Sequence, residues 1–148
     1  MARGIYVARL DATVVSTAIT LIQVNAPATA VLEILKAWVS QTLSEVSTQE
    51  EIQILRTTTA GTGTSFTPIL LSPATAAAAA TATTNHTAEG TAGDSLIREG
   101  FNVLGGWVYL PVPEERIFVA PSGRIALKFP VAPASATFTA GIIWREIG

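Results

Sequence analysis

The sequence predicts an all-β fold, a single-domain β-sandwich or jelly roll of about eight antiparallel strands with one long loop rich in alanine and threonine. Short runs rich in Val, Ile and Thr recur along the chain, and these side chains favour strands. Glycine and proline separate the runs, and no alternation of strands with helices is found. The 148 residues suit one domain, residues 1–148, whose core is large enough to fold without disulfides.

The predicted strands follow one another at short intervals. They fall within residues 4–24, 28–40, 51–59, 96–113, 115–130 and 135–148. The third run, EIQILRTTT, alternates between two faces, as a strand does. Two glycines, Gly105 and Gly106, divide residues 96–113 into two strands. Residues 115–130 are typical of a hairpin, because apolar runs flank Pro121-Ser122-Gly123.

Residues 28–40, ATAVLEILKAWVS, fit two structures. Their apolar residues fall at helical spacing, with Glu33, Lys36 and Ser40 opposite, so periodicity alone favours a helix. However, the neighbouring runs are strand-like, and a strand buried on both faces is also continuously apolar. We expect a strand here, with a helix as the alternative.

Residues 73–90, PATAAAAATATTNHTAEG, are the most unusual stretch. Alanine favours a helix, but threonines interrupt the run, Pro73 precedes it and no apolar stripe would anchor a helix. Loops this long are uncommon in compact domains unless they have a function. We therefore expect a long loop over residues 73–93, without regular helix, that packs against a neighbouring chain. The expected contact residues are Ala76, Ala77, Ala78, Ala79 and Ala80.

Charge is scarce and balanced. Charged residues make up 14% of the chain, against about 25% in typical soluble domains. Nine basic and eleven acidic residues give no basic surface for nucleic acid. No run of 18 apolar residues predicts a membrane span, and no secretory signal is recognisable at the N-terminus. We expect a soluble homo-oligomer, because subunit contacts would cover much of the apolar surface.

Catalytic and metal-binding signatures are missing from the sequence. With no cysteine and one histidine, His86, neither a thiolate nor a histidine-rich metal site is expected. The pairs Glu50-Glu51 and Glu114-Glu115 are adjacent residues, which in a strand point to opposite faces and cannot form an acid–base pair. The glycines of residues 61–64, GTGT, lack the spacing of a phosphate loop, so we interpret this stretch as a turn. We expect no catalytic residue, no cofactor and no metal, and no enzymatic activity.

The large aromatic residues are expected mainly in the core. Trp107 and Tyr109 are the exception, because they follow two glycines and alternate along one face. An exposed aromatic patch or an oligomer contact is therefore an alternative for these two side chains.

Four segments together carry a family resemblance: LEILKAWVSQ, EIQILRTTTAGTGTSFTPILL, EGFNVLGGWVYLPVPEERIFVAPSG and TFTAGIIWREIG. They resemble small proteins of tailed bacteriophages, encoded near the major capsid protein, that decorate or cement the capsid. The resemblance implies a β-sandwich or jelly roll that trimerises, binds the major capsid protein at local three-fold positions and is located on the virion surface after synthesis in the host cytoplasm. Such relatives often carry an acidic PGD segment where this chain has SPATAAAAATATTN.

Two functions of different classes follow. The first is a catalytically silent cement protein that stabilises an icosahedral shell. The alternative is a phage tail or fibre head module that binds a host glycan, since the same fold suits both roles.

Overall fold

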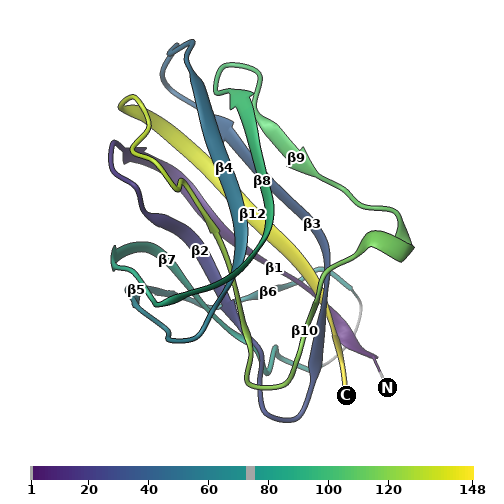
Figure 1. The fold of residues 1–148 in the computed structure, drawn as a ribbon. Helices are drawn as coiled ribbons and strands as arrows, with labels where there is room; N and C mark the ends of the chain where they lie inside the picture. The colour runs from purple at the N-terminus through teal and green to yellow at the C-terminus, as the bar shows by residue number, and fades with distance from the viewer. Residues whose placement is uncertain (1, 73–75) are drawn as a thin grey trace.

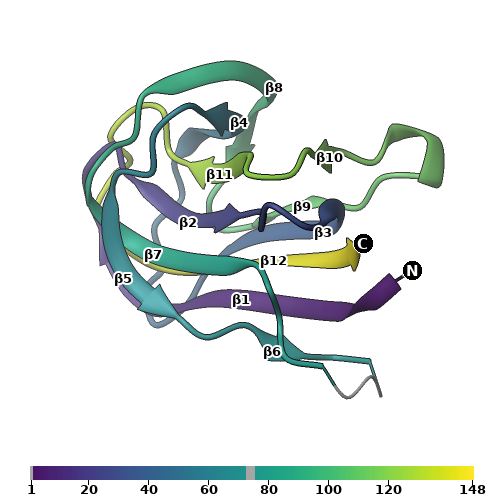
Figure 2. The same ribbon diagram turned by 90° about the horizontal axis from the view of Figure 1, so that it is seen from below.

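The β-rich runs form a β-sandwich in the computed structural model, which describes residues 2–72 and 76–148. Two antiparallel sheets of six strands each pack against one another (Figures 1 and 2). The first, sheet A, has the order β10 (Phe118–Val119), β3 (Val31–Gln41), β12 (Ala136–Ile147), β1 (Ala2–Val15) and β6 (Ile69–Leu70), and β9 (Trp107–Tyr109) also pairs with β3. The second, sheet B, has the order β5 (Thr62–Phe66), β7 (Thr81–Ala88), β2 (Thr20–Asn25), β11 (Arg124–Lys128), β4 (Gln49–Thr57) and β8 (Ala92–Asn102).

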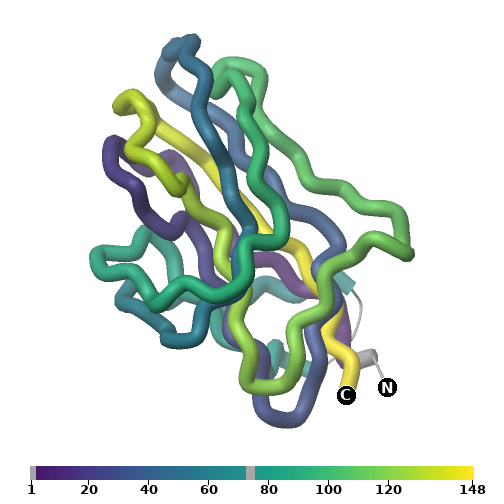
Figure 3. The backbone as a smooth tube through the Cα atoms, in the orientation of Figure 1, coloured from purple at the N-terminus to yellow at the C-terminus, as the bar shows by residue number. Residues whose placement is uncertain are grey.

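The chain passes repeatedly from one sheet to the other, as the tube in Figure 3 shows. β1 and β3 belong to sheet A, while β2 and β4 belong to sheet B. Within the described residues the only helical element is a 3₁₀ turn, η1 (Pro113–Glu115). The structure has more strands than the predicted eight because β5, β6 and β7 lie outside the predicted runs: β6 has only two residues, and β5 and β7 lie in stretches interpreted as a turn and a long loop.

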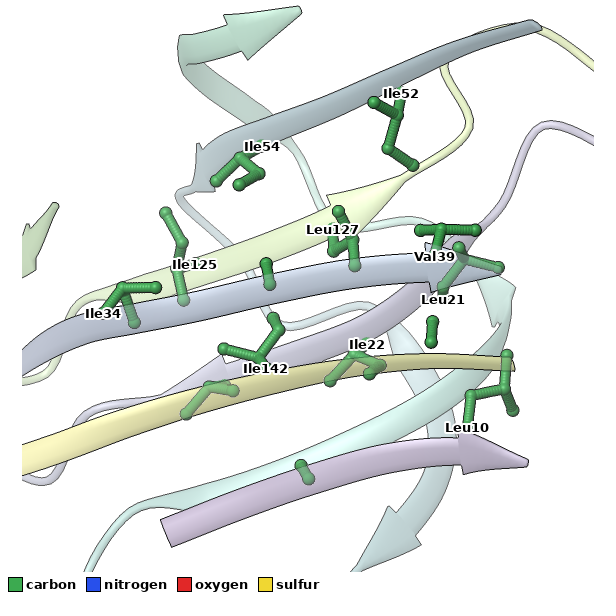
Figure 4. Packing of buried hydrophobic residues seen from close by; sticks show 14 of the residues in the cluster. Leu10, Leu21, Ile22, Ile34, Val39, Ile52, Ile54, Ile125, Leu127 and Ile142 are labelled. Atoms are coloured by element: carbon green, nitrogen blue, oxygen red, sulfur yellow. The ribbon is translucent and has the colours of Figure 1, made fainter. Parts of the chain in front are cut away.

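The core lies between the two sheets and is almost wholly apolar. Ile and Leu side chains from both sheets meet there, including Ile34 and Ile142 of sheet A and Ile54, Ile125 and Leu127 of sheet B (Figure 4). Each fully buried side chain of this size stabilises the fold by about 1.5–3 kcal/mol. An exposed ion pair contributes only about 0–1 kcal/mol. Apolar packing between the sheets therefore holds the sandwich together.

The ambiguous segment 28–40 forms a strand, as predicted. β3 lies between β12 on one edge and β9 and β10 on the other. Its helix-like spacing arises from an irregularity in the pairing with β12, where Trp144 lies opposite Ile34 and Ile143 opposite Lys36. The extra residue in β3 breaks the period of two that would have identified a strand.

The predicted hairpin at residues 115–130 is wrong. β10 pairs with β3 in sheet A, whereas β11 pairs with β2 and β4 in sheet B. The tight turn itself is present, because the Gly123 N–H donates to the Ala120 carbonyl oxygen at 2.8 Å and Ser122 has a φ of 62°. The turn carries the chain between the sheets, and Ser122 and Gly123 are held there by main-chain bonds with Pro27 and Ala26.

The predicted long loop over residues 73–93 is also wrong in its larger part. Residues 73–75 lie outside the described residues, but Thr81–Ala88 form β7, which pairs with β2 and β5 on its two sides. β8 then begins at Ala92. The threonine-rich composition is that of a strand, and no regular helix forms over residues 76–90, in agreement with prediction. The turn predicted over residues 61–64 is likewise mostly strand, because β5 begins at Thr62 and only Gly61, which has a positive φ, precedes it.

The outer face of sheet A has one tightly fitted contact. Gly141 of β12 lies opposite Trp38 of β3, and the indole covers the place where a side chain at residue 141 would be. The ammonium group of Lys36 lies 5.2 Å from the indole centroid, within reach of a cation–π attraction.

We predict that Gly141→Ala lowers the free energy of unfolding by about 1–3 kcal/mol, because the new methyl group overlaps the Trp38 ring. The measurement is urea denaturation. In a Trp38→Ala background the same substitution is expected to have a much smaller effect.

Gly100→Ala on β8 is the matched control, since an added Cβ there meets only the Glu50 carbonyl oxygen at 3.9 Å. An equal loss of stability with and without Trp38 would contradict this account of Gly141.

Candidate functional site

The alanine run predicted as an interface lies partly against the chain's own core. Ala76 and Ala77 are exposed, Ala78 and Ala79 are half-buried, and Ala80 is buried. Ala80 belongs to the core cluster, and Ala78 packs against it. The end of the run therefore packs on the core of its own domain. Only the start of the run is open to a neighbour.

A buried carboxylate anchors this alanine run to sheet A. Glu146 of β12 has no exposed surface, and its two oxygens accept the N–H groups of Ala79 at 3.1 Å and Ala80 at 2.8 Å. The hydroxyl of Tyr6 on β1, also fully buried, donates to the Ala76 carbonyl oxygen at 2.9 Å. Charge-assisted bonds of this kind are roughly twice as strong as neutral ones. They bind main-chain groups that have no strand partner.

Burial raises the pKa of the Tyr6 hydroxyl, and the negative charge of Glu146 raises it further. Tyr6 therefore remains a hydrogen-bond donor throughout the neutral range. The sequence hides the anchor, because Glu146 is separated from Ala80 by 66 residues. The one sequence signal for this anchor is the position of Glu146 on β12, where it continues the alternation of the buried residues Ile142 and Trp144.

Trp107 and Tyr109 do not form an exposed aromatic patch. Trp107 is 8% exposed and belongs to the core cluster, and its indole N–H donates to the Glu99 carboxylate at 2.8 Å. Tyr109 is half-buried, and its hydroxyl donates to the Glu115 carbonyl oxygen at 2.9 Å. The core interpretation of Trp107 is thus correct, and Tyr109 braces the segment that follows β9.

Exposed apolar side chains gather instead along the adjoining segment. We call them the edge row, and they are between 48% and 71% exposed: Leu104, Val108, Leu110, Val112 and Phe118. β9 and β10 pair with the same edge of β3, and the stretch between them projects beyond the sandwich (Figures 1 and 2). The sequence signal for the edge row is the alternation of apolar residues in VYLPVP, which on its own predicts only a strand.

An ionic cluster around the buried side chain of Glu33 holds the projecting stretch to sheet A. Glu33 of β3, whose side chain is 8% exposed, accepts from Arg116 at 2.9 Å and lies 3.2 Å from the guanidinium of Arg145 on β12. Arg116 follows η1 directly. Because a carboxylate this buried needs charged partners, Glu33 fixes the return of the chain from η1 to β10.

Glu50 and Glu51 have structural roles, whereas Glu114 and Glu115 are exposed and belong to η1, not to a strand. Glu50 accepts from the Thr48 hydroxyl and from the Ala134 N–H, while Glu51 pairs with Arg98 at 2.5 Å. The two adjacent side chains thus have separate partners, as their positions in a strand predict. Over residues 2–72 and 76–148, no group of three or more His, Asp or Glu side chains is placed to hold a metal ion.

His86 is buried on the same face of β7 as Ala82 and Thr84, and only 3% of it is exposed. It lies beside an irregularity, since the register against β5 shifts between Thr62 and Thr64 and Asn85 has a φ of 47°. Its Nε2 lies 2.8 Å from the Thr83 hydroxyl, and burial lowers its pKa, although the nearby Glu89 carboxylate partly offsets the effect.

In the described part of the chain, no helix is both long enough and apolar enough to cross a membrane. No protein-family model, no curated protein and no solved structure matches this chain.

Replacing Glu146 with Ala is expected to lower the free energy of unfolding by roughly 2–5 kcal/mol, because two main-chain N–H groups lose their acceptor. Urea denaturation measures the loss. Glu146→Gln keeps one acceptor oxygen and should lose less. Hydrogen exchange should show fast exchange at the Ala79 and Ala80 amides in Glu146→Ala.

Glu51→Ala serves as the control, because its ion pair with Arg98 is exposed and is worth about 0–1 kcal/mol. Continued protection of the Ala79 and Ala80 amides in Glu146→Ala would show that the carboxylate does not anchor the run.

Stability should fall as the pH drops below about 6.5, the ordinary pKa of histidine, because the unfolded chain then binds a proton that buried His86 resists. The contribution of His86 is complete above pH 6.5 and is lost as the pH falls toward its lowered folded pKa. In this window the slope reaches about 1.4 kcal/mol per pH unit.

The measurement is urea denaturation at several pH values between 4.5 and 7.5, on the natural chain and on His86→Gln. The difference between the two profiles removes the contribution of the carboxylates, which both chains share. Parallel pH profiles would rule out His86 as the source.

Proposed function

We propose that this chain is a structural virion protein, a capsid decoration or cement protein that binds the major capsid protein of a bacteriophage shell as a homotrimer. The observation that carries the proposal is the edge row. Five apolar side chains lie along one projecting edge of sheet A, each about half exposed or more. Clusters of this kind on a soluble domain mark surfaces that other proteins cover.

The scarcity of charge supports the same function. Charged residues make up 14% of the chain, so a large part of its surface carries no formal charge. Protein interfaces are depleted of Lys, Glu and Asp at their centres. The sequence resemblance to phage decoration proteins agrees with this interpretation.

The form of the edge indicates contact through side chains. β9 has three residues, and Pro111 and Pro113 follow it. Proline cannot donate to a strand ladder, so a partner strand cannot extend sheet A along this edge. Leu110 and Val112 are then the side chains best placed to enter a pocket on a partner.

A trimer makes weak contacts effective. A three-fold ring uses one heterologous contact that closes after three copies. Binding a shell at three points raises the overall affinity without strong single contacts. The ionic cluster of Glu33, Arg116 and Arg145 supplies the rigid support for such a contact.

The test is to add the purified protein to capsids that lack it and to measure their melting temperature, with light scattering for the oligomeric state. We expect a trimer that binds and raises the melting temperature. The double variant Leu110→Asp/Val112→Asp should bind at least about tenfold more weakly, because burying an unpaired charge is costly.

Val14→Asp is the matched control, since Val14 is 65% exposed but lies on β1, which does not pair with β3 or β9. It should behave like the natural chain. A natural chain that neither binds the shells nor shifts their melting would refute the proposed function. Equal binding by the edge-row variant would remove the edge row from the contact.

A further inference from the structure

An open groove of about 410 Å³ lies where sheet A and sheet B separate, between β10 and the neighbouring ends of β4, β8 and β11. In Figures 1 and 2 these four strands lie near one another. The side chains of interest here come from both sheets: Arg56, Thr58, Asp94, Phe118 and Arg124. The volume is within the range of about 300–1,000 Å³ for small-molecule sites.

Two arginines at this groove have no acidic partner. The basic side chains that form ion pairs in the described structure are Arg9, Arg98, Arg116, Lys128 and Arg145. Arg56 and Arg124 are not among them, so no described carboxylate lies within 4.0 Å of either. Two unneutralised guanidinium groups at one groove make a local positive site on a chain whose net charge is −2.

Both guanidinium groups are positioned by the main chain. Arg56 donates through one nitrogen, Nη1, to the Phe118 carbonyl oxygen at 3.0 Å. Arg124 donates in the same way to the Thr58 carbonyl oxygen at 3.2 Å. A guanidinium carries five N–H donors, so each retains free donors beside its one bond to the main chain. That bond restricts the side chain and so reduces the entropy that a ligand would otherwise have to overcome.

The groove also offers an acceptor and a flat apolar surface. Asp94 is exposed and forms no ion pair within the described residues. Phe118 is 48% exposed, and Gly93 beside Asp94 leaves the main chain of β8 uncovered. An aromatic face packs well against the C–H face of a sugar ring, and a carboxylate accepts hydrogen bonds from hydroxyl groups.

We propose that this groove binds an acidic sugar, a hexuronate unit of a polysaccharide. Its carboxylate lies against Arg56 and Arg124, its hydroxyls donate to Asp94 and its ring packs on Phe118. A phosphate ion has no ring to pack on Phe118. An acidic peptide side chain has no hydroxyl groups to donate to Asp94, and its carboxylate would lie near that of Asp94. The groove shares Phe118 with the edge row, but sugar binding is tested on the protein without capsids and so is separate from the proposed capsid contact.

The experiment is calorimetric titration with trigalacturonic acid, compared with the neutral galactose trisaccharide of the same linkage. The acidic trisaccharide should bind at least about tenfold more tightly, because hydrogen bonds to charged groups are stronger than those between neutral groups. Arg124→Gln and Arg56→Gln should each weaken its binding by about tenfold or more. Phe118→Ala should weaken both trisaccharides.

Arg3→Gln is the matched control, since Arg3 also lacks an ion pair among the described residues and only donates to the Thr29 hydroxyl. It should bind within twofold of the natural chain. Thermal melting checks the fold of each variant. If Arg56→Gln does not fold, the binding measured with Arg124→Gln tests the proposal. The proposal is overturned if the acidic trisaccharide fails to bind, if the neutral one binds equally, if Arg3→Gln is equally impaired, or if phosphate or a glutamate-rich peptide binds as tightly.

Discussion

The pairing of β12 between β1 and β3 is the constraint on which the other features depend. β12 contributes Phe138, Ile142 and Trp144 to the core, all of them fully or almost fully buried. The same strand provides Gly141, on which Trp38 lies, and Glu146, which binds the alanine run. Arg145 of this strand pairs with Glu33 and so supports the projecting edge. A shift of β12 by one residue would turn each of these side chains to the opposite face.

The sequence predicted the fold class because strand propensity and turn composition are local properties. The strand at β3 was also predictable, from its neighbours and despite its spacing. Sequence reasoning failed where distant residues decide the outcome. The run Ala76–Ala80 is held by Glu146 and Tyr6, more than 60 residues away in either direction. The turn at Pro121-Ser122-Gly123 is locally correct, but only the pairing of β11 with β2 and β4 shows that it connects two sheets.

The candidate surfaces were hidden for a related reason. The exposure of Leu110 and Val112 depends on β9 and β10 pairing with the same edge of β3, and no periodicity in the sequence encodes that. Arg56 and Arg124 line one groove because β4 and β11 are neighbours in sheet B. Phe118 belongs to both surfaces, since it closes the edge row and lines the groove. A large partner on the edge row and a ligand in the groove would therefore meet at this one ring.

The central place of β12 also determines how the chain can fold during synthesis. β1 and β3 are made first, but neither pairs with the other, because β12 separates them in sheet A. Until residues 136–147 leave the ribosome, both strands keep an open edge. Pairing across such a sequence separation is slow, and open edges invite association between chains. The nascent chain is thus most vulnerable to aggregation before β12 emerges, and the addition of β12 then joins β1 to β3.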